Sequence, residues 1–528
     1  MEAAASSARS YSQAQDSRYR WEVLVVVMIG TLMAALDSSI VNISLPDIMA
    51  DFGTTIDSIE WVVTGYMLAY AVFIPLAAWA RERLGSRNLY IYSLIVFTVG
   101  SLLCGLAWNL PSLIVARVIQ AFGGGFITPT GMAMVSEVFP PKERGRAMGL
   151  WGLGVIVGPA LGPTIGGFLT KTVGWRSIFM VNIPIGVLTV LLAQALLRPS
   201  PPLHQAHRKP FDAWGFLFLS IFLVGFLLGV SKGEREGWSS AYILTCFGAS
   251  LLGLIGFIAA EYGTKYGILD FSLFKSRVFS ASIMVTAGRA VAIFGATFLL
   301  PLFMQNLMGL DELQSGLLLL PGSLLLALCM PVAGRLSDKM GPRYLVLAGS
   351  LGMAFFMYLY RRLDANSSEL AVVLPTFVRG ISASLMVAPV MATALNAIPT
   401  DKATAGSVLL NVTQQVSGSA SIAVLATVLD HRQHFQMAVL AQRLQESGGF
   451  ALRGSVRQAV ELGYSHRDAV LASMARAGAL VAKASAVRAF DDTFLIGGAA
   501  ILVASLPVFL LPNHNIAHGP HDGAAAME

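Results

Sequence analysis

The chain has 528 residues, of which 55% are hydrophobic and only 12% are charged, and its net charge is +6. So few charged residues cannot cover the surface of a soluble protein of this length, which excludes a soluble globular fold. The basic residues are distributed over many loops, which argues against a nucleic-acid-binding protein. The cysteines Cys104, Cys246 and Cys329 all fall in apolar segments, so we expect neither a disulfide framework nor a thiolate metal site.

Fourteen apolar segments run along the chain. A helix needs about 20 predominantly apolar residues to cross a bilayer, and each segment meets or nearly meets this length. The predicted spans are 22–45, 59–80, 88–108, 111–135, 147–169, 177–197, 213–231, 241–261, 279–307, 315–334, 344–360, 371–396, 404–429 and 493–511. We therefore expect an all-α membrane protein with fourteen transmembrane helices.

The first span carries an acidic residue, Asp37, between the uncharged stretches 23–36 and 38–46. A charge at this depth costs at least a few kcal/mol, and such residues usually mark an ion or substrate pathway. Asn42 is close enough along the helix to continue a polar stripe. A purely structural acid, bonded to a neighbouring helix, is the alternative. The pattern favours a carboxyl group that binds and releases a proton.

Arg117 lies inside the fourth span, and Gln120 falls on the same helix face. This arginine either packs against backbone carbonyls or takes part in the function. The fifth span has glycine at every fourth position, a spacing that permits close helix approach. The motif comprises Gly154, Gly158, Pro159, Gly162, Pro163, Gly166 and Gly167.

Lys and Arg concentrate in the short loops on the side of the N-terminus, with three each in 81–87, 142–146 and 335–343. The positive-inside rule then predicts that both termini are cytoplasmic, in a multi-pass protein of the inner (plasma) membrane.

Two of these loops form an internal repeat. Residues 78–87 and 334–343 share the pattern small-x-x-x-acid-base-x-Gly-x-Arg, and each follows the second helix of a half. Repeated halves are the plan of one large transporter class. The predicted organisation is an N-terminal tail (1–21), a six-helix bundle (22–197), a linker with two extra helices (198–278), a second six-helix bundle (279–511) and a C-terminal tail (512–528).

The second half contains further polar residues within its spans. Arg289 and Arg379 either pair between helices or face a cavity, and in a cavity Arg289 would favour anionic or weakly acidic substrates. Asn411 and Gln414 share a helix face and either line the cavity or bond neighbouring helices.

The segment 430–490 has an amphipathic helical pattern but is too polar to span a membrane. We expect it to lie outside, within the second bundle's last connection, as a spacer or as a docking segment.

Several motifs together resemble the major facilitator superfamily, and within it the fourteen-helix drug:H⁺ antiporters of the EmrB/QacA type. The stretch LDSSIVNISLPDI (36–48) resembles the first-helix signature of that family. The repeated loops resemble its cytoplasmic gating motif, 117–125 its fourth-helix motif, and the glycine-rich span its antiporter motif. Glu82 and Ala78 replace the usual Asp and Gly of the first gating loop.

The resemblance implies a major facilitator fold of two six-helix bundles plus two extra helices. It implies proton coupling by Asp37 with Arg117, and a substrate cavity with candidate residues Asn42, Gln120, Arg289, Arg379, Asn411 and Gln414. It also implies a cytoplasmic gate made of Glu82, Arg83, Arg87, Asp338, Lys339 and Arg343. By the same resemblance, segment 430–490 would dock a periplasmic membrane-fusion adaptor that leads to an outer-membrane channel.

The function that we expect is proton-coupled export of amphipathic or hydrophobic small molecules by alternating access, with multiple drugs or toxic compounds as substrates. We expect no cofactor, metal, nucleic acid or enzymatic activity. One alternative is proton-coupled uptake or export of a single metabolite, for example a fatty acid or a siderophore-like acid. Another is a membrane-bound acyltransferase-like enzyme, but most histidines lie in loops or tails, which argues against it.

Overall fold

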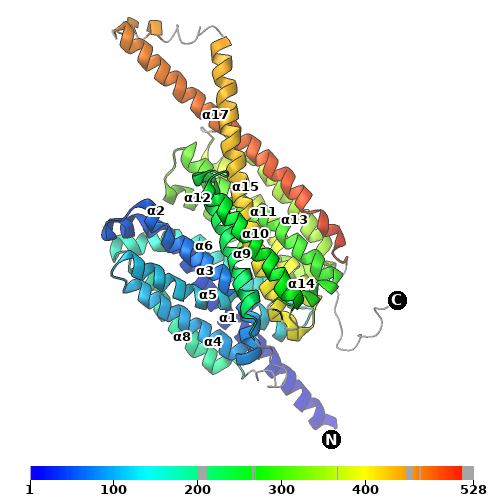
Figure 1. Cartoon of the computed structure of the whole chain (residues 1–528). Coiled ribbons are helices and arrows are strands. Elements are labelled where there is room, and N and C mark those ends of the chain that lie inside the picture. The colour runs from blue at the N-terminus through cyan, green and yellow to red at the C-terminus, as the bar shows by residue number, and fades with distance from the viewer. Residues whose placement is uncertain are drawn as a thin grey trace.

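A computed structural model of the chain describes residues 2–199, 211–263, 267, 269–364, 367–446, 456–458, 460–462 and 465–513. These residues form helices and connecting turns, with no strand among them (Figure 1). The first half contains α1 (Glu2–Phe52), α2 (Ile56–Ile59), α3 (Trp61–Phe73), α4 (Leu76–Gly105), α5 (Leu110–Val138), α6 (Arg144–Thr172), α7 (Ser177–Met180) and α8 (Asn182–Leu196). An inserted pair follows, α9 (Ala213–Glu236) and α10 (Ala241–Gly263). The second half contains α11 (Arg277–Asn306), α12 (Glu312–Met340), α13 (Pro342–Tyr360), α14 (Glu369–Asn396), α15 (Ala403–Glu446) and α17 (His466–Ala504).

The all-α membrane architecture is confirmed. Twelve helices of the described residues are long and apolar enough to cross a membrane, or 13 if the two parts of α6, bent by 42°, count as one span. Gly85 has a left-handed backbone (φ 75°), which breaks α4 after Leu84. The helix α3 and the part of α4 before this break are together compatible with a fourteenth crossing. The predicted second span, 59–80, falls on these pieces.

The repeated loops take the same backbone conformation in both halves. Gly85 has φ 75° and ψ 158°, and Gly341 has φ 82° and ψ 163°. A side chain strongly disfavours this region, so glycine is required where each second helix turns into the third. The sequence repeat therefore reflects a structural repeat.

Polar caps determine where α5 and α12 begin. Asn109 accepts a hydrogen bond from the backbone of Ser112 at 2.9 Å and starts α5. Asp311 accepts one from the backbone of Gln314 at 2.7 Å and starts α12. Each cap satisfies an amide that a helix N-terminus otherwise leaves unpaired.

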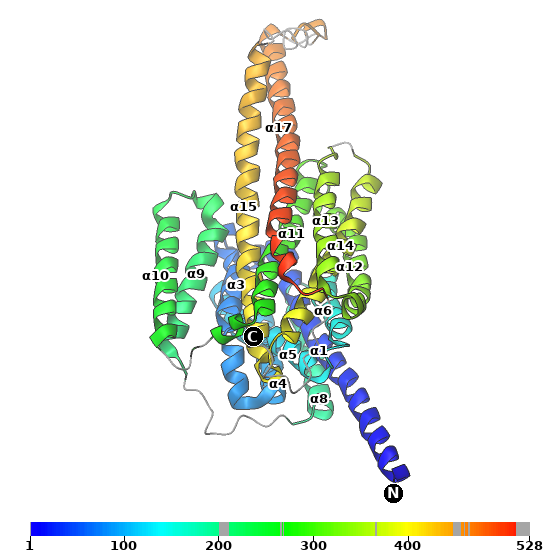
Figure 2. The same cartoon turned by 90° about the vertical axis from the view of Figure 1, so that its right-hand side faces the viewer.

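The inserted helices α9 and α10 pack against each other, and α9 also contacts α3 of the first half and α15 of the second. Figure 2 shows this pair standing at the edge of the molecule. The window of α10 that qualifies as a span is only 22% buried, as expected for a helix that mostly faces lipid.

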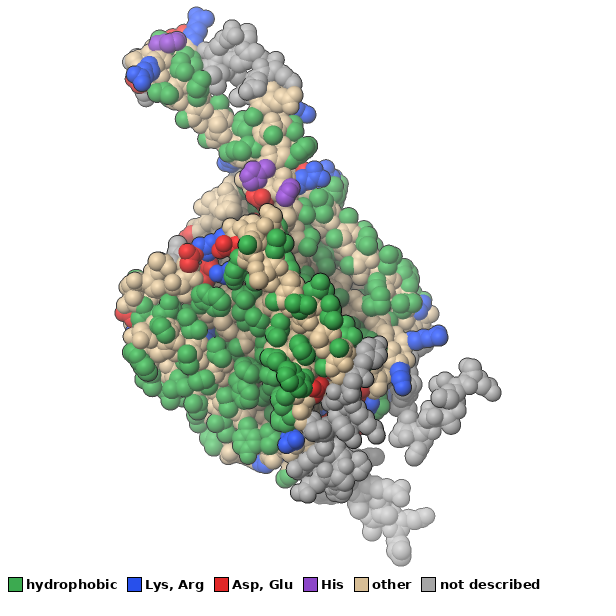
Figure 3. Space-filling view, in the orientation of Figure 1, with side chains coloured by type: hydrophobic (Ala, Val, Ile, Leu, Met, Phe, Trp, Pro, Cys, Tyr) green, Lys and Arg blue, Asp and Glu red, His purple; other side chains and the backbone are tan. Residues whose placement is uncertain are grey.

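The helices α15 and α17 pack along each other and extend far beyond the rest of the bundle as a hairpin (Figure 2). They contain most of the described residues of segment 430–490 and confirm its helical pattern. In Figure 3, hydrophobic side chains cover the visible face of the bundle, and charged and histidine side chains gather where the hairpin leaves it. The N-terminal end of α1 extends in the opposite direction (Figure 2).

We call the end of the bundle at which α1 enters and the last helix finishes the terminal side. Trp21 packs there against Phe139, and Arg343 donates to the carbonyl of Leu511 at 2.7 Å. The hairpin leaves the bundle on the opposite side, which we call the hairpin side (Figure 1).

Candidate functional site

Asp37 is the centre of a buried polar network between the helices of the first half. Its side chain is 0% exposed in α1. Arg117 Nη1 of α5 donates to Oδ2 at 2.6 Å, Gln120 Nε2 of α5 donates to Oδ1 at 2.8 Å, and Asn182 Nδ2 of α8 donates to Oδ1 at 2.7 Å. Three donors, one of them cationic, stabilise a negative charge that the apolar surroundings would otherwise disfavour.

The guanidinium of Arg117 is held on all sides. It donates to the carboxylate of Asp37, to Gln120 Oε1 at 2.7 Å and to the carbonyl of Val62 at 3.3 Å. Its central carbon also lies 3.9 Å from the ring centroid of Tyr66, a cation–π contact. Removing one partner of such a buried pair leaves an uncompensated charge, which costs about 3–5 kcal/mol.

The structure thus brings together Asp37 and Arg117, the residues that the sequence proposes for proton coupling. It places Gln120, expected in the substrate cavity, in this network instead of on the cavity wall. Sequence reasoning missed Asn182, which also donates to Ser101 Oγ at 3.0 Å. The signal was available, since Asn182 is a polar residue within the predicted span 177–197.

The glycine stripe of α6 lies against α1, next to Asp37. A Cβ atom on Gly158 would lie only 2.6 Å from the backbone nitrogen of Leu36, the neighbour of Asp37. Backbones approach so closely only where no side chain intervenes. The other stripe glycines also face α1: a Cβ atom on Gly154 would first meet the backbone of Met28, and one on Gly162 or Gly166 would first meet the side chain of Ser39 or Ile40.

The remaining members of the motif have other surroundings. A Cβ atom on Gly167 would meet only Ile43, at 3.9 Å, which is ordinary contact. Pro159 lines the cavity described next. The side chain of Pro163 lies outside the described part of the chain.

A cavity of about 440 Å³ lies between the two halves. One wall comes from α6, with Trp151 and Pro159, and the other walls come from α11, α12, α14 and α15. The lining is mostly apolar, and the volume lies within the range of small-molecule sites. Trp151 also donates Nε1 to Thr31 of α1 at 3.1 Å, so this wall is tied to the helix that carries Asp37.

Three of the predicted substrate-cavity residues, Arg289, Arg379 and Gln414, line this cavity. Arg289 is 3% exposed and donates Nη2 to Gln414 Oε1 at 2.8 Å. Asn42 and Asn411 are not among its described lining residues. Asn42 is exposed, and the amide of Asn411 donates to the carbonyl of Ser407 at 2.8 Å.

The halves are joined by hydrogen bonds at the terminal side. Asp338 of α12 accepts from the backbone nitrogens of Gly145 and Arg146, at 3.0 Å each, and so caps the start of α6. Arg144 donates to Asn396 Oδ1 at 2.6 Å. Arg81 pairs with Glu137 at 2.7 Å within the first half. Arg81 also donates to the carbonyl of Asp401 in the second half at 2.6 Å.

The other predicted gate residues lie at the same end of the bundle. Arg83 stacks over Trp79 at 4.6 Å, and Arg87 donates to the carbonyl of Gln194 at 2.8 Å, both within the first half. Arg343 binds the carbonyl of Leu511 within the second half. Glu82 is half-buried in α4, and Lys339 lines a groove with Asp338. Of the six predicted gate residues, Asp338 is the one whose described hydrogen bonds join the two halves.

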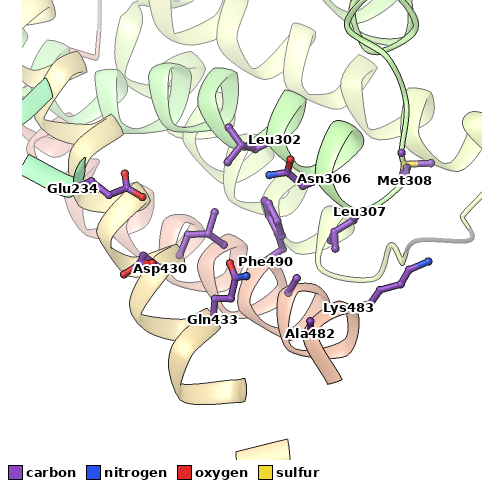
Figure 4. A pocket seen from close by; sticks show the side chains of 13 residues that line it. Glu234, Leu302, Asn306, Leu307, Met308, Asp430, Gln433, Ala482, Lys483 and Phe490 are labelled. Carbon is purple, nitrogen blue, oxygen red and sulfur yellow. The ribbon is translucent and has the colours of Figure 1, made fainter. Parts of the chain in front are cut away.

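A second pocket, of about 820 Å³, lies on the hairpin side between α9, α11, α15 and α17 (Figure 4). Glu234 and Asp430 lie at one side of it and Lys483 at the other, with Phe490 between them. Its lining is more polar than that of the cavity between the halves, and it adjoins the base of the hairpin. Among the described residues, no group of three or more His, Cys, Asp and Glu side chains is placed to hold a metal ion.

The sequence of this chain is similar to those of known transporters. Residues 27–422 match the model of the Major Facilitator Superfamily. A "Multidrug resistance protein B homolog" of Mycobacterium tuberculosis is 32% identical over 501 residues, covering 93% of this chain and 90% of that protein. "Multidrug export protein EmrB" of Escherichia coli is 29% identical, with 79% and 82% covered. Among solved structures, the human organic anion transporter MFSD10 (TETRAN) aligns with a TM-score of 0.59 at 13% identity, covering 93% of this chain and 99% of that chain, which shows likeness of fold alone.

Proposed function

This chain belongs to the major facilitator superfamily, and from that premise we propose that it exports amphipathic or hydrophobic small molecules in exchange for protons. The observation that carries the proposal is the carboxylate of Asp37, fully buried and held by Arg117, Gln120 and Asn182. Such a group inside a membrane protein is expected to serve an ion pathway. The names of the multidrug-resistance relatives support the substrate class.

Coupling in this proposal runs through α6 and α1. Pro159 and Trp151 line the cavity, while the adjoining Gly158 touches the backbone beside Asp37. A proton on Asp37 weakens its pair with Arg117, and α1 then shifts against α6. Because these backbones are in contact, the shift reaches the cavity wall. A substrate that favours one arrangement therefore biases the proton toward binding or release.

We further propose that the terminal side is cytoplasmic and that the structure corresponds to the outward-facing state of alternating access. The excess of Lys and Arg in the loops at this end supports the orientation. The bonds of Asp338 and Arg144 across the halves support a closed cytoplasmic side.

The test is transport by the purified protein in proteoliposomes. An imposed pH gradient should drive uptake or export of at least one compound from a panel of dyes and weak acids, and Asp37→Asn should abolish this while the protein remains folded. The amide retains the size of the side chain but cannot carry the exchanged proton. Gradient-driven transport at the wild-type rate by the Asn variant would exclude Asp37 as the essential proton carrier.

For the hairpin we propose docking to a periplasmic membrane-fusion adaptor that leads to an outer-membrane channel. Leu471, Met474 and Leu480 are 58%, 55% and 62% exposed on α17, which leaves apolar surface available for a partner. Replacing residues 438–480 by a short flexible linker preserves the pocket at the base. This deletion should spare transport in proteoliposomes but reduce resistance in whole cells. Full resistance of the deletion variant would make the hairpin a spacer.

A further inference from the structure

Two arginines of the second half face the cavity between the halves, and neither has an acidic partner among the residues that the structure describes. Arg289 of α11 is 3% exposed, and its Nε atom has no hydrogen-bond partner among the described residues. Its described side-chain hydrogen bond goes to Gln414, a neutral amide. Arg379 of α14 lines the same cavity and, within the described part of the chain, makes no hydrogen bond or ion pair.

The contrast with the other buried arginine is informative. Arg117 is neutralised by Asp37 at 2.6 Å and shielded by Tyr66. The cavity wall offers Arg289 and Arg379 no such neutralisation, because none of its described lining residues is acidic. A guanidinium buried among apolar groups without a counter-charge is unfavourable, so this wall is complementary to a negative charge that arrives from outside.

We infer that the cavity takes amphipathic organic anions, with a carboxylate or sulfonate at Arg289 and Arg379 and an apolar body along the remaining wall. The inference rests on the proposed function, in which this cavity is the transport site. A guanidinium offers paired N–H donors that match the oxygens of a carboxylate. The apolar body would lie against Ile293, Phe294 and Leu317, which also line the cavity.

The test compares three probes of nearly equal shape: 11-(dansylamino)undecanoic acid, its methyl ester, and a dansyl alkyl trimethylammonium of the same chain length. Binding to the purified full-length protein in detergent is followed by dansyl fluorescence, without a pH gradient, in chloride and in gluconate buffers. The acid should bind at least about tenfold more tightly than the ester, a typical magnitude for one charged hydrogen-bonded pair. The ammonium probe should bind most weakly.

The variants Arg289→Met and Arg379→Met remove the charge and keep an unbranched apolar side chain. Each should lower affinity for the acid while leaving affinity for the ester nearly unchanged, and Arg289→Lys should restore part of the preference. Arg362→Met is the matched control, because this arginine of the second half is exposed, donates to the hydroxyl of Tyr358 at 2.7 Å and is not among the described lining residues of the cavity. Size-exclusion profiles and melting curves check folding, and the probe comparison on the unaltered protein stands even if a variant fails to fold.

Equal affinities for acid and ester in both buffers would overturn the inference, as would tightest binding of the ammonium probe. A preference for the acid that survives in both Met variants would overturn it too. Binding and coupling are measured separately, so the two proposals fail distinguishably. If no pH gradient drives transport but the protein still prefers the acid in an arginine-dependent way, only the proton-coupled function is refuted. Gradient-driven transport without any acid preference refutes the present inference alone.

Discussion

Gly158 of α6 faces the backbone nitrogen of Leu36 in α1 so closely that a Cβ atom on the glycine would lie 2.6 Å from it. Leu36 directly precedes Asp37, whose carboxylate holds Arg117, Gln120 and Asn182. Position 158 therefore joins the cavity wall to the buried acid by backbone contact.

Gly158→Ala should separate α1 from α6 and impair transport. The added methyl group has no space, and overpacking of this kind costs roughly 1–3 kcal/mol. We expect proteoliposome transport to fall about tenfold or more, since 1.4 kcal/mol corresponds to a factor of ten. The matched control is Gly167→Ala in the same helix, where the new Cβ meets only Ile43 at 3.9 Å. Equal transport by both variants would show that the close approach is not required.

Asn182→Ala should weaken coupling through loss of one of the three donors to Asp37. A lost hydrogen bond to a charged group costs about 1.5–3 kcal/mol, so we expect transport to slow by roughly one order of magnitude or more. Ser101→Ala is the control, because Ser101 contacts Asn182 but makes no described hydrogen bond to Asp37. Transport rates measured at several pH values should differ in profile only for the Asn182 variant. A profile unchanged from wild type would limit Asn182 to packing.

Asp338→Ala should open the terminal side more often, because it removes both hydrogen bonds to the start of α6. Two hydrogen bonds to a charged group, at about 1.5–3 kcal/mol each, correspond to roughly a hundredfold or more in the equilibrium between the open and closed terminal side. The reporter is Met330→Cys, in a background without Cys104, Cys246 and Cys329, labelled by an impermeant maleimide applied from the terminal side.

The control for this experiment comes from the repeat. Arg87 lies in the corresponding loop of the first half, but it donates to a carbonyl within that half. Arg87→Ala should therefore leave the labelling rate of the reporter cysteine near that of the unaltered gate. If Asp338→Ala labels no faster than Arg87→Ala, the contacts of Asp338 do not hold the gate closed.

Asp270 and Lys402 form an ion pair of 2.8 Å between loops at the terminal side, outside the predicted spans. Burial raises the pKa of Asp270, but the hydrogen bonds from Lys402 and Ser272 outweigh it and lower the pKa below its usual value. The stabilisation is therefore present above about pH 4, the ordinary value, and is lost as pH falls through the folded pKa.

Melting temperatures of the wild type and of Lys402→Met in detergent check this. They should differ slightly at pH 7, because the Lys402 side chain is 36% exposed and the pair is screened. The difference should shrink as the pH falls below about 4. A difference that is constant from pH 7 to pH 3 would show that Lys402 contributes through packing and not through charge.

The sequence is informative about the helices and about Asp37, because a membrane requires long apolar segments and makes a charge within one conspicuous. The repeat likewise predicted equivalent turns, which Gly85 and Gly341 form. Asn182 was harder to assign, since its orientation toward Asp37 depends on how α8 packs against α1 and α4. Arg144 and Asn396 are far apart in sequence and meet only because the halves close at the terminal side. No local pattern encodes such a contact.

The most direct test of proton coupling is the release of protons on substrate binding. The purified protein in weakly buffered detergent solution, with a pH-sensitive dye, receives a compound that the proteoliposome assay has identified as a substrate. We predict that the wild type releases protons in proportion to bound substrate, and that Asp37→Asn binds the compound without any proton signal. A proton signal of wild-type size from Asp37→Asn, or none from a wild type that binds the substrate, would contradict the central role of Asp37.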